Sequence, residues 1–174
     1  MDLMMVAFVE SFKYVGHLIP VACLRIFLGG YYLKHAIASF QSDFLVKAYL
    51  AEDIRNHLPQ STAPEWFRWF LENAVIPNWQ VFAISLAVAQ LFIGASYVIG
   101  YLVRPAAIAG VVLSMGLMGA IGVGGVHGSG NLIGISLQAT TFMLVLHLIL
   151  GWIGAGRCLG LDYYFYKRHR GFWW

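Results

Sequence analysis

The stretch VFAISLAVAQLFIGASYVIGYLV occupies residues 81–103 and is apolar almost throughout, with Gln90 as its strongly polar interior residue. A helix needs roughly 20 mostly apolar residues to cross a bilayer. The stretch is therefore long enough for a membrane span. Three other stretches of similar character lie at about residues 18–40, 106–125 and 131–153.

The overall composition also indicates a lipid environment. Apolar residues make up 60% of the 174 positions and charged residues 11%, with a mean hydropathy of +0.71. A soluble domain usually carries about 25% charged residues. We therefore expect an all-α fold, an integral membrane four-helix bundle that forms a single domain. The net charge of +3 is modest and indicates basic clusters at a membrane surface rather than a nucleic-acid-binding face.

The distribution of lysine and arginine predicts the orientation, because cytoplasmic loops are enriched in these residues. Six basic residues belong to one face and three to the other: Lys13, Arg104, Arg157, Lys167, Arg168 and Arg170 against Lys47, Arg55 and Arg68. This bias places both termini, including the tail at 154–174, in the cytoplasm. The expected location is a prokaryotic inner membrane.

The segment 41–78 carries five acidic residues and is not a span. Apolar residues recur in it every four positions at Val46, Leu50, Ile54 and Leu58, which is typical of one helical stripe. Aromatic residues follow at 66–70. We expect short amphipathic helices at the outer interface, where tryptophan is favoured. A solvated loop folded over the bundle is the alternative.

Several short motifs occur in a fixed order along the chain. They are LRIFLG at 24–29, QLFIG at 90–94, GYLVRP at 100–105, GAGR at 154–157 and GLD at 160–162. This order, on four predicted spans, resembles the DoxX/DoxD-like membrane proteins from about Pro20 to Asp162. The sequence differs from that pattern at Gln90, where family members often have glutamate.

The resemblance implies a four-helix bundle. It also implies a role like that of the DoxD branch, whose members are small subunits of thiosulfate:quinone oxidoreductase. The expected function is thus a subunit of a quinone-linked redox complex rather than a self-sufficient enzyme. No covalent cofactor is expected, whereas quinone and bound lipid are. The expected partners are membrane lipids and other membrane subunits, in a hetero-complex or a homo-oligomer. The alternative is a non-catalytic subunit that braces a larger membrane assembly.

Arg25, Gln90 and His147 are polar residues inside predicted spans. Ionisable groups within a membrane are costly and usually have a partner or a function. If the three face inward, they form a polar pocket whose donors suit the carbonyl oxygens of a quinone. The alternative is that Arg25 snorkels to the headgroups and His147 bonds a neighbouring backbone.

Two further groups of residues are candidates for binding or structure. Lys34, His35 and His127 gather near the predicted outer ends of the first and third spans, where they would hold a small anion or belong to an ordinary turn. A structural ion pair is expected at the inner face among Arg104, Arg157 and Asp162. The scattered histidines predict no metal site.

Overall fold

The computed structural model describes residues 19–60, 63–121, 137–157 and 160–162. All regular secondary structure within these ranges is helical, so the predicted all-helical fold is confirmed there. The four longest helices are α2 (Ile19–Gln41), α5 (Trp79–Ile99), α6 (Val103–Ile121) and α7 (Leu137–Ile153). α2 and α5 begin within two residues of the starts expected for their stretches, whereas residues 131–136, at the start of the fourth stretch, lie outside the described part.

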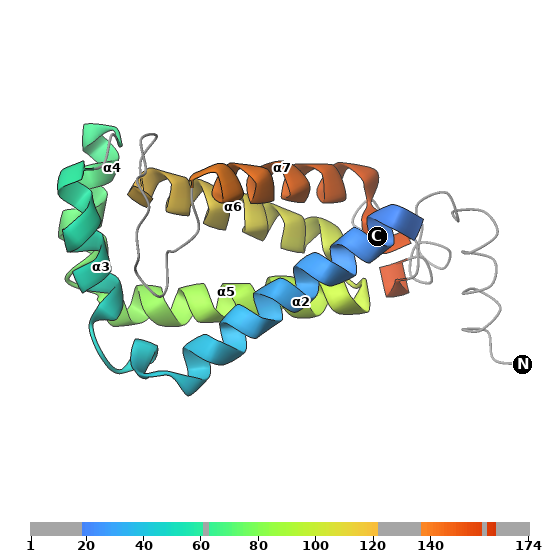
Figure 1. The fold of residues 1–174 in the computed structure, drawn as a ribbon, viewed down its shortest axis with the longest axis horizontal. Coiled ribbons are helices and arrows are strands. Elements are labelled where there is room, and N and C mark those ends of the chain that lie inside the picture. The colour runs from blue at the N-terminus through green and yellow to red at the C-terminus, as the bar shows by residue number, and fades with distance from the viewer. Residues whose placement is uncertain (1–18, 61–62, 122–136, 158–159, 163–174) are drawn as a thin grey trace, which may run out of the picture.

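The four long helices pack side by side around one core (Figure 1). α2 packs along α5, α5 along α6, and α6 along α7. The core contains Leu28 of α2, Ile93 and Tyr97 of α5, Ala106 of α6 and Leu150 of α7, all buried. Every one of these helices therefore contributes its inward face to a single apolar interior.

Glycines set the closest helix contacts and the turn between α5 and α6. A Cβ on Gly94 would lie 2.8 Å from the backbone nitrogen of Leu33, so α2 and α5 touch at backbone distance. Gly100 ends α5 because it adopts a φ of 72°, a left-handed conformation that glycine tolerates best. α6 then starts at Val103, two residues before the proline that was expected to precede it.

The segment between α2 and α5 folds into short helices at one end of the bundle, opposite the end where α2 starts and α7 finishes (Figure 1). These helices are η2 (Asp43–Leu45), α3 (Tyr49–His57), η3 (Leu58–Gln60), α4 (Glu65–Phe70) and the π-helical η4 (Leu71–Val75). Ile54, Leu58, Leu71 and Val75 form a small second core. The predicted stripe is confirmed except at Val46, which precedes α3 and is exposed.

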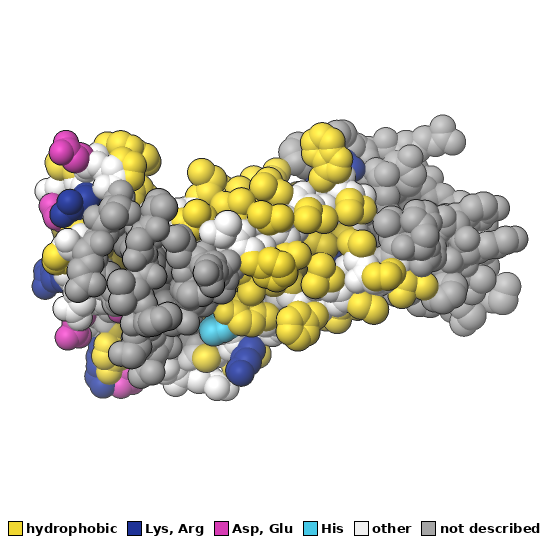
Figure 2. Space-filling model, turned by 45° about the horizontal axis from the view of Figure 1, so that its top comes forward, with side chains coloured by type: hydrophobic (Ala, Val, Ile, Leu, Met, Phe, Trp, Pro, Cys, Tyr) yellow, Lys and Arg dark blue, Asp and Glu magenta, His cyan; other side chains and the backbone are white. Residues whose placement is uncertain are grey.

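α5 is the one described helix that is long and apolar enough to cross a membrane; Val103–Gly119 and Thr140–Ile153 are shorter apolar helices. Many large apolar side chains on the bundle face outward, among them Phe27, Val81 and Val112. In the view of Figure 2 they form a broad apolar surface along the middle, and most visible charges gather at the α3–α4 end. Membrane crossing by four helices stays a prediction.

Candidate functional site

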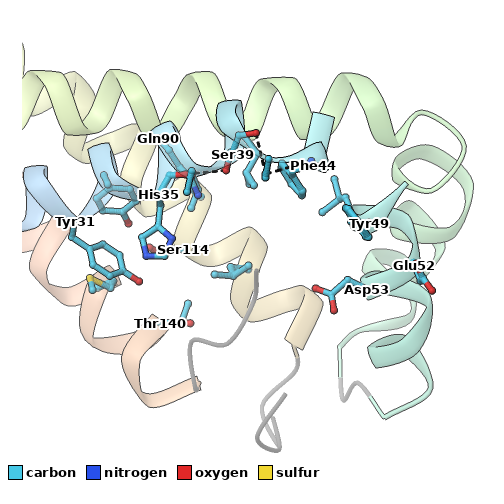
Figure 3. A pocket seen from close by; sticks show the side chains of 18 of the residues that line it. Tyr31, His35, Ser39, Phe44, Tyr49, Glu52, Asp53, Gln90, Ser114 and Thr140 are labelled. Carbon is cyan, nitrogen blue, oxygen red and sulfur yellow. Dashed lines mark hydrogen bonds between the residues drawn. The ribbon is translucent and has the colours of Figure 1, made fainter. Parts of the chain in front are cut away.

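A cavity of about 610 Å³ opens between the bundle and α3 (Figure 3). This volume falls within the range of roughly 300–1,000 Å³ that is usual for small-molecule sites. All four long helices and α3 contribute to its walls. The lining side chains include Tyr31, Tyr32, His35, Ser39, Leu86, Gln90, Leu113, Ser114, Leu117, Thr140, Met143, Tyr49, Glu52 and Asp53.

The two sides of the cavity differ in chemistry. Glu52 and Asp53 face it from α3, on the side opposite Tyr31 (Figure 3). The bundle side carries uncharged hydrogen-bonding groups, including Gln90 and Ser114, set among leucines and Met143. The Gln90 Oε1 atom is buried and has no hydrogen-bond partner among the described residues. The bundle side therefore suits a neutral ligand with its own polar atoms.

Tyr32 connects the cavity to a hydrogen-bonded chain in the core. The Tyr32 hydroxyl lies 2.8 Å from Nε2 of His147, and the Tyr97 hydroxyl lies 2.6 Å from Nδ1 of the same ring. Tyr32 also has a side-chain hydrogen bond with Ser114, which lines the cavity. His147 and Tyr97 are both 0% exposed. The imidazole is thus enclosed, with a phenol at each nitrogen.

Gly110 on α6 makes room for this imidazole. A Cβ at position 110 would lie 2.4 Å from both Cε1 and Nδ1 of His147. Non-bonded Cβ atoms do not approach other atoms so closely. The imidazole ring cannot easily move aside, because both of its nitrogens are held by hydrogen bonds. A glycine is therefore required opposite His147 for α6 and α7 to pack as they do.

Arg25 lies in a different place, at the end of the bundle where α2 starts and α7 finishes. Its side chain is 0% exposed, and its Nη1 atom donates to the carbonyl oxygen of Ala155 over 2.7 Å. Gly100 and Gly160 approach the guanidinium so closely that a Cβ on either would lie 2.8 or 2.9 Å from Nη1. Arg25 therefore joins α2 to the turn after α5 and to the segment after α7.

Asp162 completes this cluster. Its carboxylate accepts hydrogen bonds from the backbone N–H groups of Leu102 and Val103, at 2.9 and 3.2 Å, and its own N–H donates to Gly100 over 2.9 Å. The first amides of a helix lack partners within the helix and favour an anion, so Asp162 caps α6. Burial raises the pKa of Asp162, while the two amides and the charges of Arg25 and Arg104 act in the opposite direction.

The structure separates the three residues predicted to share a polar pocket. Gln90 lines the cavity. His147 lies behind the cavity wall and reaches it through Tyr32. Arg25 belongs to the cluster with Ala155. Because Arg25 is fully buried in the protein, it does not snorkel to a surface, and His147 bonds two side chains rather than a backbone group.

The other predicted groups are placed only in part. Lys34 is exposed, whereas His35 lines the cavity and packs against Tyr31, with ring centroids 4.4 Å apart and ring planes tilted by 56°. His127 lies outside the described residues. Asp162 binds backbone amides and lies within electrostatic reach of Arg104. The side chain of Arg157 also lies outside the described part, so its role in the ion pair stays a prediction.

Tyr32, Tyr97 and Ser114 are site residues that the sequence did not single out. Tyrosine is common at membrane interfaces, and serine is common where helices pack closely, so neither type signals a site by itself. Both tyrosines lie well inside apolar stretches, however, and a buried phenol needs a hydrogen-bond partner. The need of these two phenols for a partner could have pointed to the site, because the stretch 131–153 contains a histidine that can bond them.

Comparisons of the chain with protein-family models, with curated proteins and with solved structures gave no match.

Proposed function

We propose that this chain is a four-span, DoxX/DoxD-like membrane protein that binds a quinone headgroup in the cavity between α2, α3, α5, α6 and α7. In this proposal it serves as one subunit of a quinone-linked redox complex. The observation that carries the proposal is the cavity itself, which combines apolar walls with the uncharged polar groups of Tyr32, Gln90 and Ser114. A quinone ring is flat and apolar, and its carbonyl oxygens need hydrogen-bond donors.

The membrane part of the proposal is supported by the exposed side chains. Trp66 and Trp69 on α4 are 70% and 66% exposed, and Trp152 near the opposite end of the bundle is 89% exposed. Tryptophan is enriched at both membrane–water interfaces. A broad apolar surface runs along the middle of the molecule in Figure 2, and soluble monomers rarely expose large contiguous apolar patches. In this arrangement α3 and α4 lie at the outer interface.

The charges around the cavity argue against an anionic ligand there. Glu52 and Asp53 contribute carboxylates to the wall formed by α3, and like charges repel an approaching anion. Lys34 is exposed and does not line the cavity. We therefore propose that this cavity binds the quinone and that it does not bind an oxidised sulfur anion.

The proposal is tested by the quinone content of protein purified in mild detergent. Gln90→Leu replaces the buried amide with an apolar group of similar size, and Gln80→Leu, on the exposed surface of the same helix, is the matched control. Losing one hydrogen bond costs about 0.5–1.5 kcal/mol, or roughly two- to twelvefold in affinity. Bound quinone should fall by that factor in Gln90→Leu and stay unchanged in Gln80→Leu.

The same preparation tests the bracing role. The outward apolar side chains of α2, such as Phe27, suit contact with helices of other subunits as well as with lipid. If other membrane subunits co-purify and no quinone is found in the parent protein, the quinone proposal is wrong and the bracing role is supported.

A further inference from the structure

The hydrogen-bond directions around His147 can be worked out from its partners. A neutral imidazole has one N–H donor and one bare nitrogen acceptor. Tyrosine hydroxyls lie at both ring nitrogens and Gly110 lies against the ring, and none of these neighbours is acidic. An imidazolium fully buried among such groups would be costly, so the ring is neutral. One tyrosine must then donate to it and the other must accept from it.

Tyr97 determines which tyrosine donates. Its hydroxyl is fully buried, and His147 is its hydrogen-bond partner among the described residues. If Nδ1 carried the proton, the Tyr97 hydroxyl would accept, and its own proton would have no acceptor among those residues. A buried donor left without an acceptor costs about 1–3 kcal/mol. Tyr97 therefore donates to Nδ1, and the ring proton is on Nε2.

The consequence reaches the cavity through Tyr32. Because Nε2–H donates to the Tyr32 oxygen, the Tyr32 proton must point elsewhere. Tyr32 lines the cavity and is next to Ser114. A serine hydroxyl both donates and accepts, so Ser114 can accept a hydrogen bond from the Tyr32 hydroxyl when no ligand is present. When a ligand arrives, the Tyr32 hydroxyl can donate to the ligand instead.

We propose that His147 fixes Tyr32 as a hydrogen-bond donor toward the cavity, where it binds a carbonyl oxygen of the quinone. This inference rests on the quinone-binding function proposed above. His147 is a positioning residue, since the wall of the cavity separates it from the ligand. The proposal thereby names both the ligand atom that is recognised, a carbonyl oxygen, and the side chain that recognises it, Tyr32.

The histidine tautomer gives a direct test that needs no ligand. In detergent-solubilised protein labelled with ¹⁵N-histidine, His147 should show a protonated Nε2 and an unprotonated Nδ1. In Tyr97→Phe, which leaves the cavity lining unchanged, the ring should become a mixture of both tautomers. A protonated Nδ1 in the parent protein overturns the inference without affecting the proposed function.

Binding of menadione, a quinone with two carbonyl groups, provides the second test. Tyr32→Phe should weaken its binding roughly two- to twelvefold, the value of one hydrogen bond. Tyr31→Phe is the matched control, because Tyr31 also lines the cavity and has no hydrogen bond to His147. Equal affinities of the two variants overturn the inference alone. Failure of the parent protein to bind menadione overturns the proposed function and this inference together.

Discussion

Replacing Arg25 with leucine should loosen the bundle and leave quinone binding intact. The Arg25 side chain is fully buried, and its Nη1 atom bonds Ala155 over 2.7 Å. It also lies within electrostatic reach of Asp162. A hydrogen bond from a charged group contributes about 1.5–3 kcal/mol, and the carbonyl of Ala155 would lose this partner inside the protein. The expected loss in free energy of unfolding is thus about 2–3 kcal/mol.

A loss of this size is measurable by thermal unfolding. For a chain of about this length, 1 kcal/mol shifts Tm by roughly 2–4 °C, so Arg25→Leu should lower Tm by about 4–12 °C. Lys34→Leu is the matched control, since it removes an exposed cation from the same helix, and it should change Tm by no more than about 2 °C. Quinone content should match the parent protein in both variants.

The coupling between Arg25 and Asp162 refines this test. Both belong to the cluster around Gly100, and residues in one network give non-additive effects. The double variant Arg25→Leu, Asp162→Asn should therefore lose less stability than the sum of the two single variants. An unchanged Tm for Arg25→Leu together with lost quinone would refute the structural role, and Arg25 would then have to act on the ligand.

Three further predictions concern packing, topology and pH. Gly110→Ala should destabilise the protein by about 1–3 kcal/mol because its Cβ would overlap the buried imidazole ring, whereas Gly116→Ala on the same helix meets nothing within 4 Å and should be neutral or slightly stabilising in thermal unfolding. In intact cells, a cysteine introduced as Asn73→Cys should react with an impermeant thiol reagent from outside and one introduced as Gly171→Cys should not; the reverse pattern would invert the topology. Burial raises the pKa of Asp162 above its ordinary value of 3.8, so the folded chain holds that proton more tightly than the unfolded chain does. The protonated Asp162 therefore stabilises the fold at pH values below its ordinary pKa, and this stabilisation is lost as the pH rises through its raised pKa in the folded chain. Asp162→Asn should flatten this decline in melts recorded between about pH 3 and 6, and an unchanged profile would contradict it.

The positions of the long helices could be predicted because long apolar stretches are read directly from the sequence. The helix ends were less predictable. The stretch at 81–103 looked continuous, but Gly100 breaks it with a left-handed φ and Leu102 also has a positive φ of 56°. A tight turn between two apolar helices leaves no change in hydropathy to mark it.

The site was less predictable because it depends on how each helix is rotated about its axis. Residue number along a helix gives the position of Arg25 within its predicted span but not the direction in which its side chain points. Its partners come from the turn at Gly100 and from the backbone after α7. Backbone carbonyls and glycines carry no sequence signal for such a role. The sequence therefore could not show that Arg25 has different partners from Gln90 and His147.

The capping of α6 by Asp162 has a consequence for biosynthesis. A ribosome makes the chain from the N-terminus, so α2, α5 and α6 are complete long before residue 162 is added. Until then the first amides of α6 lack this carboxylate, and Arg25 has no carbonyl of Ala155 to bond before residue 155 is added. These contacts, which complete the packing of the bundle, can form only after residues 1–162 have been translated. A chain cut short before Asp162 would leave a partly assembled bundle that cellular proteases can recognise.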